Sequence, residues 1–417
     1  MTSNPEVLKT GVCVVGGGPA GVMLGFLLAR SGVQVTVLEK HADFLRDFRG
    51  DTVHPSTLEV LKQCGLMKTF SQLPHNRIDH ACVRFGGDEI RLADFSGLKP
   101  FGYIAMVPQW HFLDWLTSEA SKLPKFTLLM EHEVVDVIGD SGSPLLTGRE
   151  RVRGVLVKTR EGRLKVQADL VVGCDGRHST LRQRLGLKAL DLGAPMDVLW
   201  FRLPRASSDG EGLEARLGHG HMMVMINRAD YWQIAYLVPK GHEHKLRGRC
   251  ITEFQAQVSK LAPELKGRCS SLDSWDLVKT LVVGVDRLER WHVPGAILIG
   301  DAAHTMSPIG GVGINLAIQD ALSAANVIIG AMHRGEPLDP RVLSQIQKRR
   351  LPATKRMQWI QTQIQKRVIS AALSANQQPK IPGVLRWLLK FAWVRRIPAR
   401  VIGYGFGRDR VDNRYVD

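Results

Sequence analysis

The chain has 417 residues, of which 44% are hydrophobic and 23% are charged. These values are typical of globular proteins and exclude collagen, wholesale disorder and a small disulfide-stapled scaffold, and the length allows two or three domains. The six cysteines contain no C-x-x-C pair, so no metal site is predicted, and reduced thiols fit a cytoplasmic protein. The first ten residues lack the pattern of a secretory signal, and no apolar run of about 18 residues predicts a membrane-spanning helix.

The net charge of +16 is concentrated near the C-terminus. Residues 331–417 hold 18 Lys and Arg but only 5 Asp and Glu, so they carry +13 of this total. The preceding 330 residues are therefore close to neutral.

The first elements form a recognisable unit. A short apolar run at 12–15 predicts a strand buried on both faces, and a glycine-rich turn at 16–21 follows it at once. A helical pattern at 22–31 leads to a second strand at 34–38. This order is typical of a strand, turn, helix, strand unit in a parallel sheet.

Gly16, Gly18 and Gly21 form G-x-G-x-x-G within this unit. The first glycine permits a tight turn, the second lets the backbone approach a pyrophosphate, and the third allows close packing of helix on strand. Glu39 lies 18 residues after Gly21, where a carboxylate can accept a hydrogen bond from a ribose hydroxyl. An acidic residue there favours FAD or NAD over NADP at this first site.

The middle of the chain changes character. Helices are predicted from Pro55 to Gly65 and over 110–122, and hairpins turn at 86–87 and 161–162. Short alternating runs between 196 and 281 predict a mostly antiparallel sheet, which we interpret as an inserted second domain.

Two further motifs follow buried strands. In the first, Asp175 and Gly176 enter a loop ahead of a helix, a pattern that serves packing as often as binding. The second begins at Gly300 and Asp301 and continues through the start of a new helix, whose N-terminus supplies positive potential. His304 lies within it and is more easily explained as a structural hydrogen-bonding residue than as a catalytic one.

The three motifs, in this order and at this spacing, resemble those of the class A flavoprotein monooxygenases, the para-hydroxybenzoate hydroxylase and ubiquinone-pathway hydroxylase superfamily. The resemblance covers about three quarters of the chain. It implies an α/β fold: a Rossmann-like FAD-binding domain with an inserted, mostly antiparallel β-sheet substrate domain and a helical C-terminal region. The expected ranges are 1–82, 103–190 and 275–340 for the FAD-binding domain, 83–102 and 191–274 for the substrate domain, and 341–417 for the basic C-terminal region.

The resemblance also implies residue roles. Glu39 would bind the adenosine ribose, Arg49 and Gln109 would contact FAD, Asp175 would serve both FAD and NAD(P)H, and Asp301 would bind the ribityl chain. Pro308 and Gly310 would surround the flavin ring, with no acid or base assigned. The full expected cofactor-binding set is Gly16, Gly18, Pro19, Ala20, Gly21, Glu39, Lys40, Arg49, Gln109, Asp175, Gly300, Asp301, Gly313, Ile314 and Asn315.

The activity implied is hydroxylation or epoxidation of an aromatic or lipophilic small molecule. NADPH or NADH would reduce FAD as a transient co-substrate, and dioxygen would react at flavin C4a to give a hydroperoxide. The substrate pocket is expected between the two domains, and about half of its candidate residues will face the other side of the sheet. Those candidates are Trp200, Met223, Met225, Trp232 and Tyr236.

Some family features have no counterpart here. The tyrosine pair that ionises the substrate of the phenol-type enzyme is not found, and the chain ends too soon after the third motif for a thioredoxin-like domain. A halogenase W-x-W-x-I-P motif and the cysteine pair of a disulfide reductase are also missing. A FAD-dependent reductase of prenyl-type double bonds remains the alternative function.

The basic region ends in an amphipathic pattern. Leu385, Leu388, Leu389 and Ala392 share one helical face, with cationic side chains around them. We favour a helix docked on the FAD-binding domain, and the alternative is peripheral contact of 382–410 with an anionic membrane surface. Nucleic acid is not expected as a partner, and the protein is expected to be a monomer or a homodimer.

Overall fold

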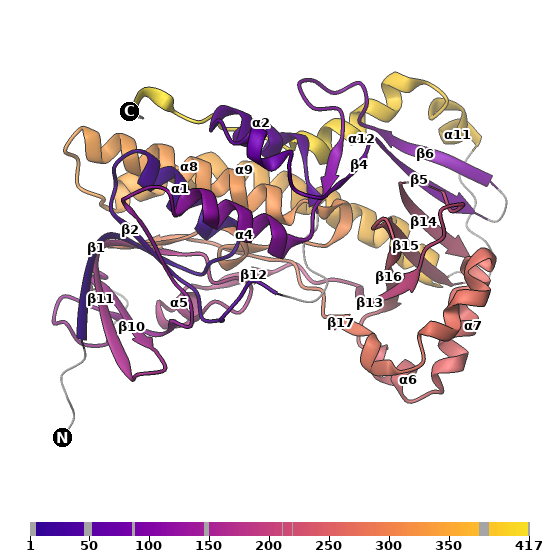
Figure 1. Cartoon of the computed structure of the whole chain (residues 1–417), viewed down its shortest axis with the longest axis horizontal. Coiled ribbons are helices and arrows are strands. Elements are labelled where there is room, and N and C mark those ends of the chain that lie inside the picture. The colour runs from indigo at the N-terminus through magenta and orange to yellow at the C-terminus, as the bar shows by residue number, and fades with distance from the viewer. Residues whose placement is uncertain are drawn as a thin grey trace.

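The computed structural model describes residues 6–45, 52–85, 88–145, 150–210, 212–218, 220–374 and 383–415. It contains two main sheets, one at each end of the molecule, with a layer of long helices over the first (Figure 1). The predicted α/β class is confirmed. The predicted domain boundaries remain a prediction.

The first sheet has eight strands, and its centre is parallel. β1 lies between β2 and β11, with Val12 beside Val35 on one side and Leu170 on the other. These residues are fully buried, which explains why the strands are continuous apolar runs. Across the sheet the order is β19 (His292–Val293), β20 (Ala296–Leu298), β11 (Arg163–Gly173), β1 (Glu6–Val15), β2 (Val35–Leu38) and β8 (Phe126–Leu129), with β10 (Gly154–Lys158) pairing β11 and β9 (Glu133–Ile138).

Helices cover one side of this sheet (Figure 1). α1 begins at Pro19, a residue well suited to a first helical position, and the chain turns at Gly32 with φ of +77°. The region Ile309–His333, which contains α8, is long and apolar enough to cross a membrane, but 89% of its apolar window is buried inside the fold. The helices of this part are α1 (Pro19–Arg30), α2 (Pro55–Gln63), α3 (Met67–Phe70), α4 (Gln109–Ala120), α5 (Thr180–Arg184), α8 (Gly313–His333) and α9 (Pro340–Ile364).

The second sheet has seven strands and is antiparallel except where β14 pairs β5. One face is covered by α7 (Ile251–Leu261) and the 3-10 helix η1 (Pro263–Ser271), beyond α6 (Glu243–Arg247). We call the opposite face the inner face, because it packs toward Ile309 and Ile364 of the first half. The strands in order are β17 (Lys279–Leu281), β13 (Met196–Pro204), β16 (Tyr231–Pro239), β15 (His221–Asn227), β14 (Leu213–Gly218), β5 (His80–Phe85) and β6 (Asp88–Asp94).

Two small three-stranded sheets connect the halves. They are β3 (Thr52–Val53), β7 (Ile104–Met106) and β4 (Asn76–Ile78), and β12 (Ala189–Asp191), β18 (Asp286–Leu288) and β21 (His304–Thr305). After α9 the chain forms a π-helical turn, η5 (Gln365–Ile369), and then α10 (Ser370–Ser374), α11 (Gly383–Leu388) and α12 (Ala392–Tyr404).

The C-terminal pattern differs from the single helical face that was expected. The chain turns at Leu389 and Lys390, where the N–H of Phe391 donates to the carbonyl of Leu388, and a new helix begins at Ala392. The leucine face is thereby interrupted: Leu389 is buried, whereas Ala392 is exposed. The side chain of Leu385 lies outside the described residues.

Candidate functional site

The three motifs meet at one edge of the parallel sheet. Gly16, Glu39, Cys174 and Ile299 each come directly after a strand, namely β1, β2, β11 and β20. Because these strands are parallel neighbours, their carboxyl ends lie side by side. Ligands of such sheets bind in the crevice outside this edge, where the strand order reverses around the first strand.

The three glycines of the first turn have different neighbours. Gly16 has φ of +107°, and a Cβ there would lie 2.4 Å from the carbonyl oxygen of Cys174. A Cβ on Gly21 would lie 1.9 Å from the carbonyl oxygen of Gly16, so this glycine allows α1 to pack on the turn. A Cβ on Gly18 would meet no atom within 4 Å. Contacts within the chain therefore explain why glycine is required at Gly16 and Gly21. They do not explain it at Gly18, where the open space fits close approach of a pyrophosphate.

Two helices present uncapped N-termini in the motif regions. α1 starts after Gly18 and α8 starts after Val312, and neither N-terminus receives a side-chain hydrogen bond at its cap. The first N–H groups of a helix have no partner within it and, with the helix dipole, favour negative charge. These termini fit a pyrophosphate at α1 and a flavin ring that becomes anionic on reduction at α8.

Glu39 is buried where the second strand ends. Its Oε2 accepts a hydrogen bond from the N–H of Gly17 at 2.9 Å, and its Oε1 accepts one from the N–H of His41 at 3.1 Å. Oε1 also lies 2.5 Å from Nδ1 of His41, so the chain already engages both oxygens, and the ribose role expected for Glu39 stays a prediction. Lys40 beside it is exposed, and Arg49 lies outside the described residues.

Asp175 follows β11 and is held by the start of α5. Its Oδ2 accepts a hydrogen bond from the N–H of Leu181 at 3.2 Å, whereas Oδ1 is buried and has no partner among the described residues. Burial raises the pKa of this carboxyl, although hydrogen bonds from Ser179 and Leu181 oppose the effect. A polar ligand group that donates to Oδ1 would satisfy this acceptor.

Arg182 connects the second and third motifs, a role that the sequence did not reveal. Its Nε donates to the carbonyl of Ala302 at 2.9 Å, and its Nη2 donates to the carbonyl of Asp301 at 3.2 Å. Its Nη1 also pairs with Asp286 at 2.8 Å. The backbone of Asp301 is therefore fixed by a residue 119 positions earlier in the chain.

His304 belongs to a buried ionic cluster. Its Nε2 lies 2.6 Å from Oδ2 of Asp320, which also accepts the N–H of Gly300, while Nε of Arg350 donates to Oδ1 of Asp320 at 2.8 Å. Burial tends to raise the pKa of Asp320, but His304 and Arg350 outweigh it and lower that pKa. His304 therefore has a structural role, as expected, and holds the Gly300 turn against α8 and α9.

The side chain of Asn315 is also engaged by the chain. Its Oδ1 accepts from the N–H of His54 at 2.9 Å and from Oγ1 of Thr57 at 2.7 Å. Its Nδ2 donates to the carbonyls of Thr52 and Gly311. Any cofactor contact of Asn315 would therefore come mainly from its backbone at the start of α8.

Three buried glutamines of α9 and η5 support the loop before α8. Gln358 donates to the carbonyl of Thr305 at 3.2 Å, and Gln361 donates to the carbonyls of Ser307 and Ile309 at 3.0 and 2.8 Å. Nε2 of Gln365 donates to Oγ of Ser307 at 2.8 Å. We call Gln358, Gln361 and Gln365 the glutamine ladder. It fixes the segment that carries Pro308.

The remaining expected cofactor residues lie at or near the starts of helices. Gln109 is the first residue of α4 and is partly exposed, and Pro308 caps the short 3-10 helix η4 (Ile309–Gly311). Gly310 has φ of +75°. Ala20 is buried beside Gly300, and Ile314 is partly buried against the core.

The substrate candidates divide between the two faces of the second sheet. Trp200 packs on the inner face, in the cluster that includes Ile309 of η4. Met223, Met225, Trp232 and Tyr236 are buried on the opposite face, against α7 and η1, so they do not face the first half of the molecule. The apolar inner-face residues of the central strands are Met196, Val198, Trp200, Met222, Val224, Ala235 and Leu237, and Arg202 and Gln233 share this face.

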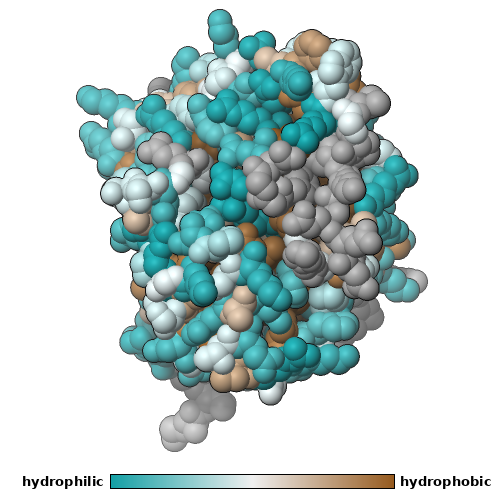
Figure 2. Space-filling view, turned by 90° about the vertical axis from the view of Figure 1, so that its right-hand side faces the viewer, coloured by the Kyte–Doolittle hydropathy of each residue, from teal (hydrophilic) through white to brown (hydrophobic). Residues whose placement is uncertain are grey.

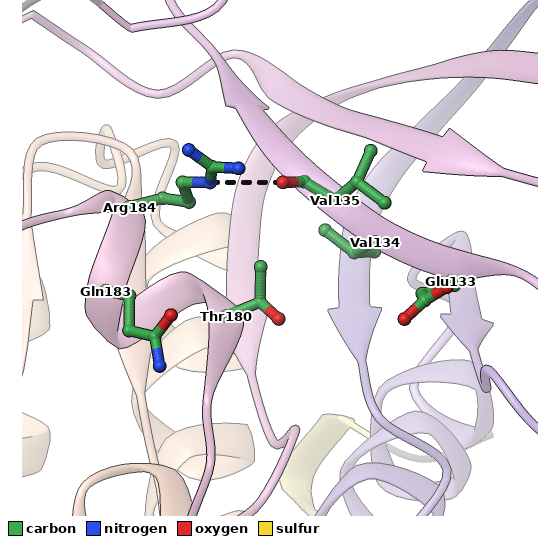
Figure 3. A pocket seen from close by; sticks show the side chains of 6 residues that line it. All are labelled: Glu133, Val134, Val135, Thr180, Gln183 and Arg184. Atoms are coloured by element: carbon green, nitrogen blue, oxygen red, sulfur yellow. Dashed lines mark hydrogen bonds between the residues drawn. The ribbon is translucent and has the colours of Figure 1, made fainter.

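A separate hollow of about 460 Å³ lies between β9 and α5. Figure 3 shows Arg184 donating to the carbonyl of Val135 across it, at 3.1 Å. Its lining contains none of the motif residues, so it does not belong to the glycine-rich edge.

Comparison with known proteins agrees with this geometry. The FAD binding domain family matches residues 9–359. The chain is 32% identical to 6-methylpretetramide 4-monooxygenase of Streptomyces rimosus over 91% of this chain and 90% of the relative, and 25% identical to 3-demethoxyubiquinol 3-hydroxylase of Escherichia coli over 84% and 87%. The crystal structure of p-nitrophenol 4-monooxygenase from Pseudomonas putida superposes with a TM-score of 0.74 at 20% identity, over 96% of this chain and 99% of that one, which shows a shared fold.

Proposed function

Because this chain belongs to the FAD binding domain family and is a FAD-dependent monooxygenase of the class A kind, we propose that it uses NAD(P)H and dioxygen to hydroxylate an aromatic or lipophilic small molecule. The observation that carries the proposal is the position of η4. Its Ile309 packs in one apolar cluster with Trp200 and Val224 of the inner face. The segment assigned to the flavin ring thus adjoins an apolar surface.

When bound, FAD supplies the transfer of reducing equivalents and the activation of dioxygen. The glycine turn, Glu39 and Asp175 would hold the cofactor. The N-terminus of α8 would stabilise negative charge at the ring, and the glutamine ladder keeps the preceding loop in place. The apolar inner face would keep water away from the reacting atoms.

The inner-face cluster that includes Ile309 is apolar, whereas Arg202 and the buried Gln233 lie on the same face by strand alternation. The apolar cluster favours a substrate with a large apolar body. No residue of the inner face is assigned as a general base, so a substrate that is already electron-rich fits best.

NAD(P)H would bind only transiently. The chain has a single G-x-G-x-x-G, and the proposal assigns it to FAD. NADPH is the first choice for assays, with NADH measured in parallel.

The test is oxygen uptake by the flavin-loaded protein with NADPH or NADH and one candidate substrate at a time, beginning with 6-methylpretetramide, the compound named in its relative. Incorporation of ¹⁸O from labelled dioxygen into product would support the proposal. A product reduced at a double bond and formed equally well without oxygen would establish the prenyl-type reductase instead.

A further inference from the structure

Among the described residues, α12 is buried against the body of the protein along one side. Ala399, Gly403 and Tyr404 are buried, and the Tyr404 hydroxyl donates to the carbonyl of Lys99 at 2.7 Å. A Cβ on Gly403 would lie 3.1 Å from Cγ of Pro55, so the helix approaches α2 closely. A C-terminal helix is therefore docked on the body, but it packs mainly against β6 of the second sheet, not on the FAD-binding domain alone as was favoured from the sequence. The other side of α12 is exposed.

That other side carries large apolar groups. Trp393 is 63% exposed, and Ile397, one helical turn later, is 57% exposed. Just before them, Trp387 is 56% and Phe391 40% exposed, with their rings in edge-to-face contact at 5.0 Å. Single exposed apolar residues are common on protein surfaces, but four within 11 residues, two of them in ring contact, concentrate exposed apolar surface in one short segment. We call these four residues the apolar tip.

The surroundings of the apolar tip are cationic. Arg386, Lys390, Arg396 and Arg400 are exposed on α11, on α12 and in the turn between them. Residues 340–408 contain no Asp or Glu. Among the described residues, Asp94 of β6 interacts with Arg395 and Arg396, and Glu59 of α2 pairs with Arg408 just after α12.

We propose that the apolar tip inserts into the headgroup layer of an anionic lipid membrane, with Lys390, Arg400 and Arg386 at the lipid phosphates. Tryptophan and phenylalanine partition well into this layer, because their rings are apolar and indole retains a hydrogen-bond donor for water. Each nearby cation strengthens attachment to an anionic surface by about fivefold. Figure 1 places α11 and α12 at one extremity of the molecule, and Figure 2 shows apolar side chains among hydrophilic ones toward the top of that end.

A second copy of this chain fits the patch less well. A two-fold contact would bring the apolar tip against itself and the same cations against one another. Without acidic partners on these helices, that arrangement is repulsive. An anionic membrane surface instead attracts these cations.

The test is flotation of the flavin-loaded protein with vesicles of phosphatidylcholine alone or mixed with phosphatidylglycerol. At low salt, we expect recovery with the mixed vesicles only, and release at high salt. The double variant Trp393→Ser/Ile397→Ser should bind about tenfold more weakly, because it removes the exposed apolar groups without touching the docked side. Leu277→Ser, which removes another exposed apolar residue at η2 (Trp275–Leu277), is the matched control and should bind as the unmodified protein does.

Two results would overturn the proposal. One is a protein that stays in the soluble fraction with mixed vesicles at low salt. The other is equal binding by the double variant, with its fold verified by retained flavin and unchanged thermal unfolding. Light scattering provides a further check, since a dimer that the double variant dissociates would assign the patch to a second copy of the chain.

Discussion

Gly18 offers a direct test of whether the glycine turn holds a dinucleotide. Its φ of −75° is readily adopted by alanine, and an added Cβ would meet no atom of the chain within 4 Å. Gly18→Ala should therefore leave the apoprotein at least as stable as before. Its free energy of unfolding should rise by up to about 1 kcal/mol, because alanine restricts the unfolded chain more than glycine does.

FAD binding should respond in the opposite direction. The new methyl group would occupy the space through which the pyrophosphate approaches the backbone, and overpacking of this kind costs about 1–3 kcal/mol. This corresponds to a dissociation constant raised by about 5- to 150-fold. The two quantities are measured separately, by thermal unfolding of the apoprotein and by titration of flavin fluorescence.

Gly21→Ala is the matched comparison. Its Cβ would lie 1.9 Å from the carbonyl oxygen of Gly16, so the apoprotein itself should be destabilised by about 3 kcal/mol. A Gly18→Ala protein that binds FAD as tightly as the unmodified protein would refute the assignment of this turn to the pyrophosphate.

Three further predictions concern the surroundings of the site. Burial lowers the pKa of His54 from 6.5 to about 4, although its hydrogen bond to Ile402 opposes the shift. The stability that depends on neutral His54 is therefore complete above pH 6.5, and about 3 kcal/mol of it is lost as the pH falls toward 4. His54→Gln should flatten this part of the pH–stability profile measured by urea unfolding, and an unchanged slope would contradict the burial argument. Gln361→Leu removes the hydrogen bonds to Ser307 and Ile309 and should weaken FAD binding. The control Gln347→Leu breaks comparable bonds to Trp291 and Glu289, and it should lower stability by about 1–3 kcal/mol and leave FAD affinity unchanged. Equal FAD affinities of the two variants would contradict a role of the glutamine ladder in FAD binding. Trp200→Ala should raise KM for the substrate, whereas Met223→Ala should cost about 2–5 kcal/mol of stability without changing KM. A KM raised by Met223→Ala but not by Trp200→Ala in steady-state kinetics would show that the inner face is wrongly assigned.

The sequence predicted best those parts of the fold that depend on local patterns. The strand, turn, helix, strand unit and the hairpin at 161–162 depend on apolar runs and turn residues, and the structure has them as β1, α1, β2 and the β10–β11 pair. The meeting of the three motifs also followed, because carboxyl ends of parallel strands share one edge.

The substrate face could not be predicted in the same way. Alternation shows which residues of a strand share a face, but it does not show which face meets the other domain. Met223 and Met225 alternate as well as Met222 and Val224 do, and only the position of α7 decides between them. Large aromatic side chains such as Trp232 belong to the hydrophobic core between the sheet and the helices α7 and η1.

Arg182 and the glutamine ladder were missed for a related reason. Gln358, Gln361 and Gln365 lie at helical spacing in a segment rich in polar residues, where glutamine usually faces water. Their role depends on hydrogen bonds to a loop about 50 residues away in the chain, and a local sequence pattern does not reveal such contacts.

The long helix after the FAD-binding motifs has a consequence for protein engineering. α9 starts at Pro340, where a boundary was expected, yet it supplies Arg350 to Asp320 and the glutamine ladder to the loop beside α8. Arg350 also donates to the carbonyl of Gly407, which ties the end of the chain to the same cluster. A chimera joined near 340 would therefore combine a loop from one parent with its scaffold from another. Exchange of the inserted sheet alone leaves these bonds within one parent, which makes it the better route to new substrate ranges.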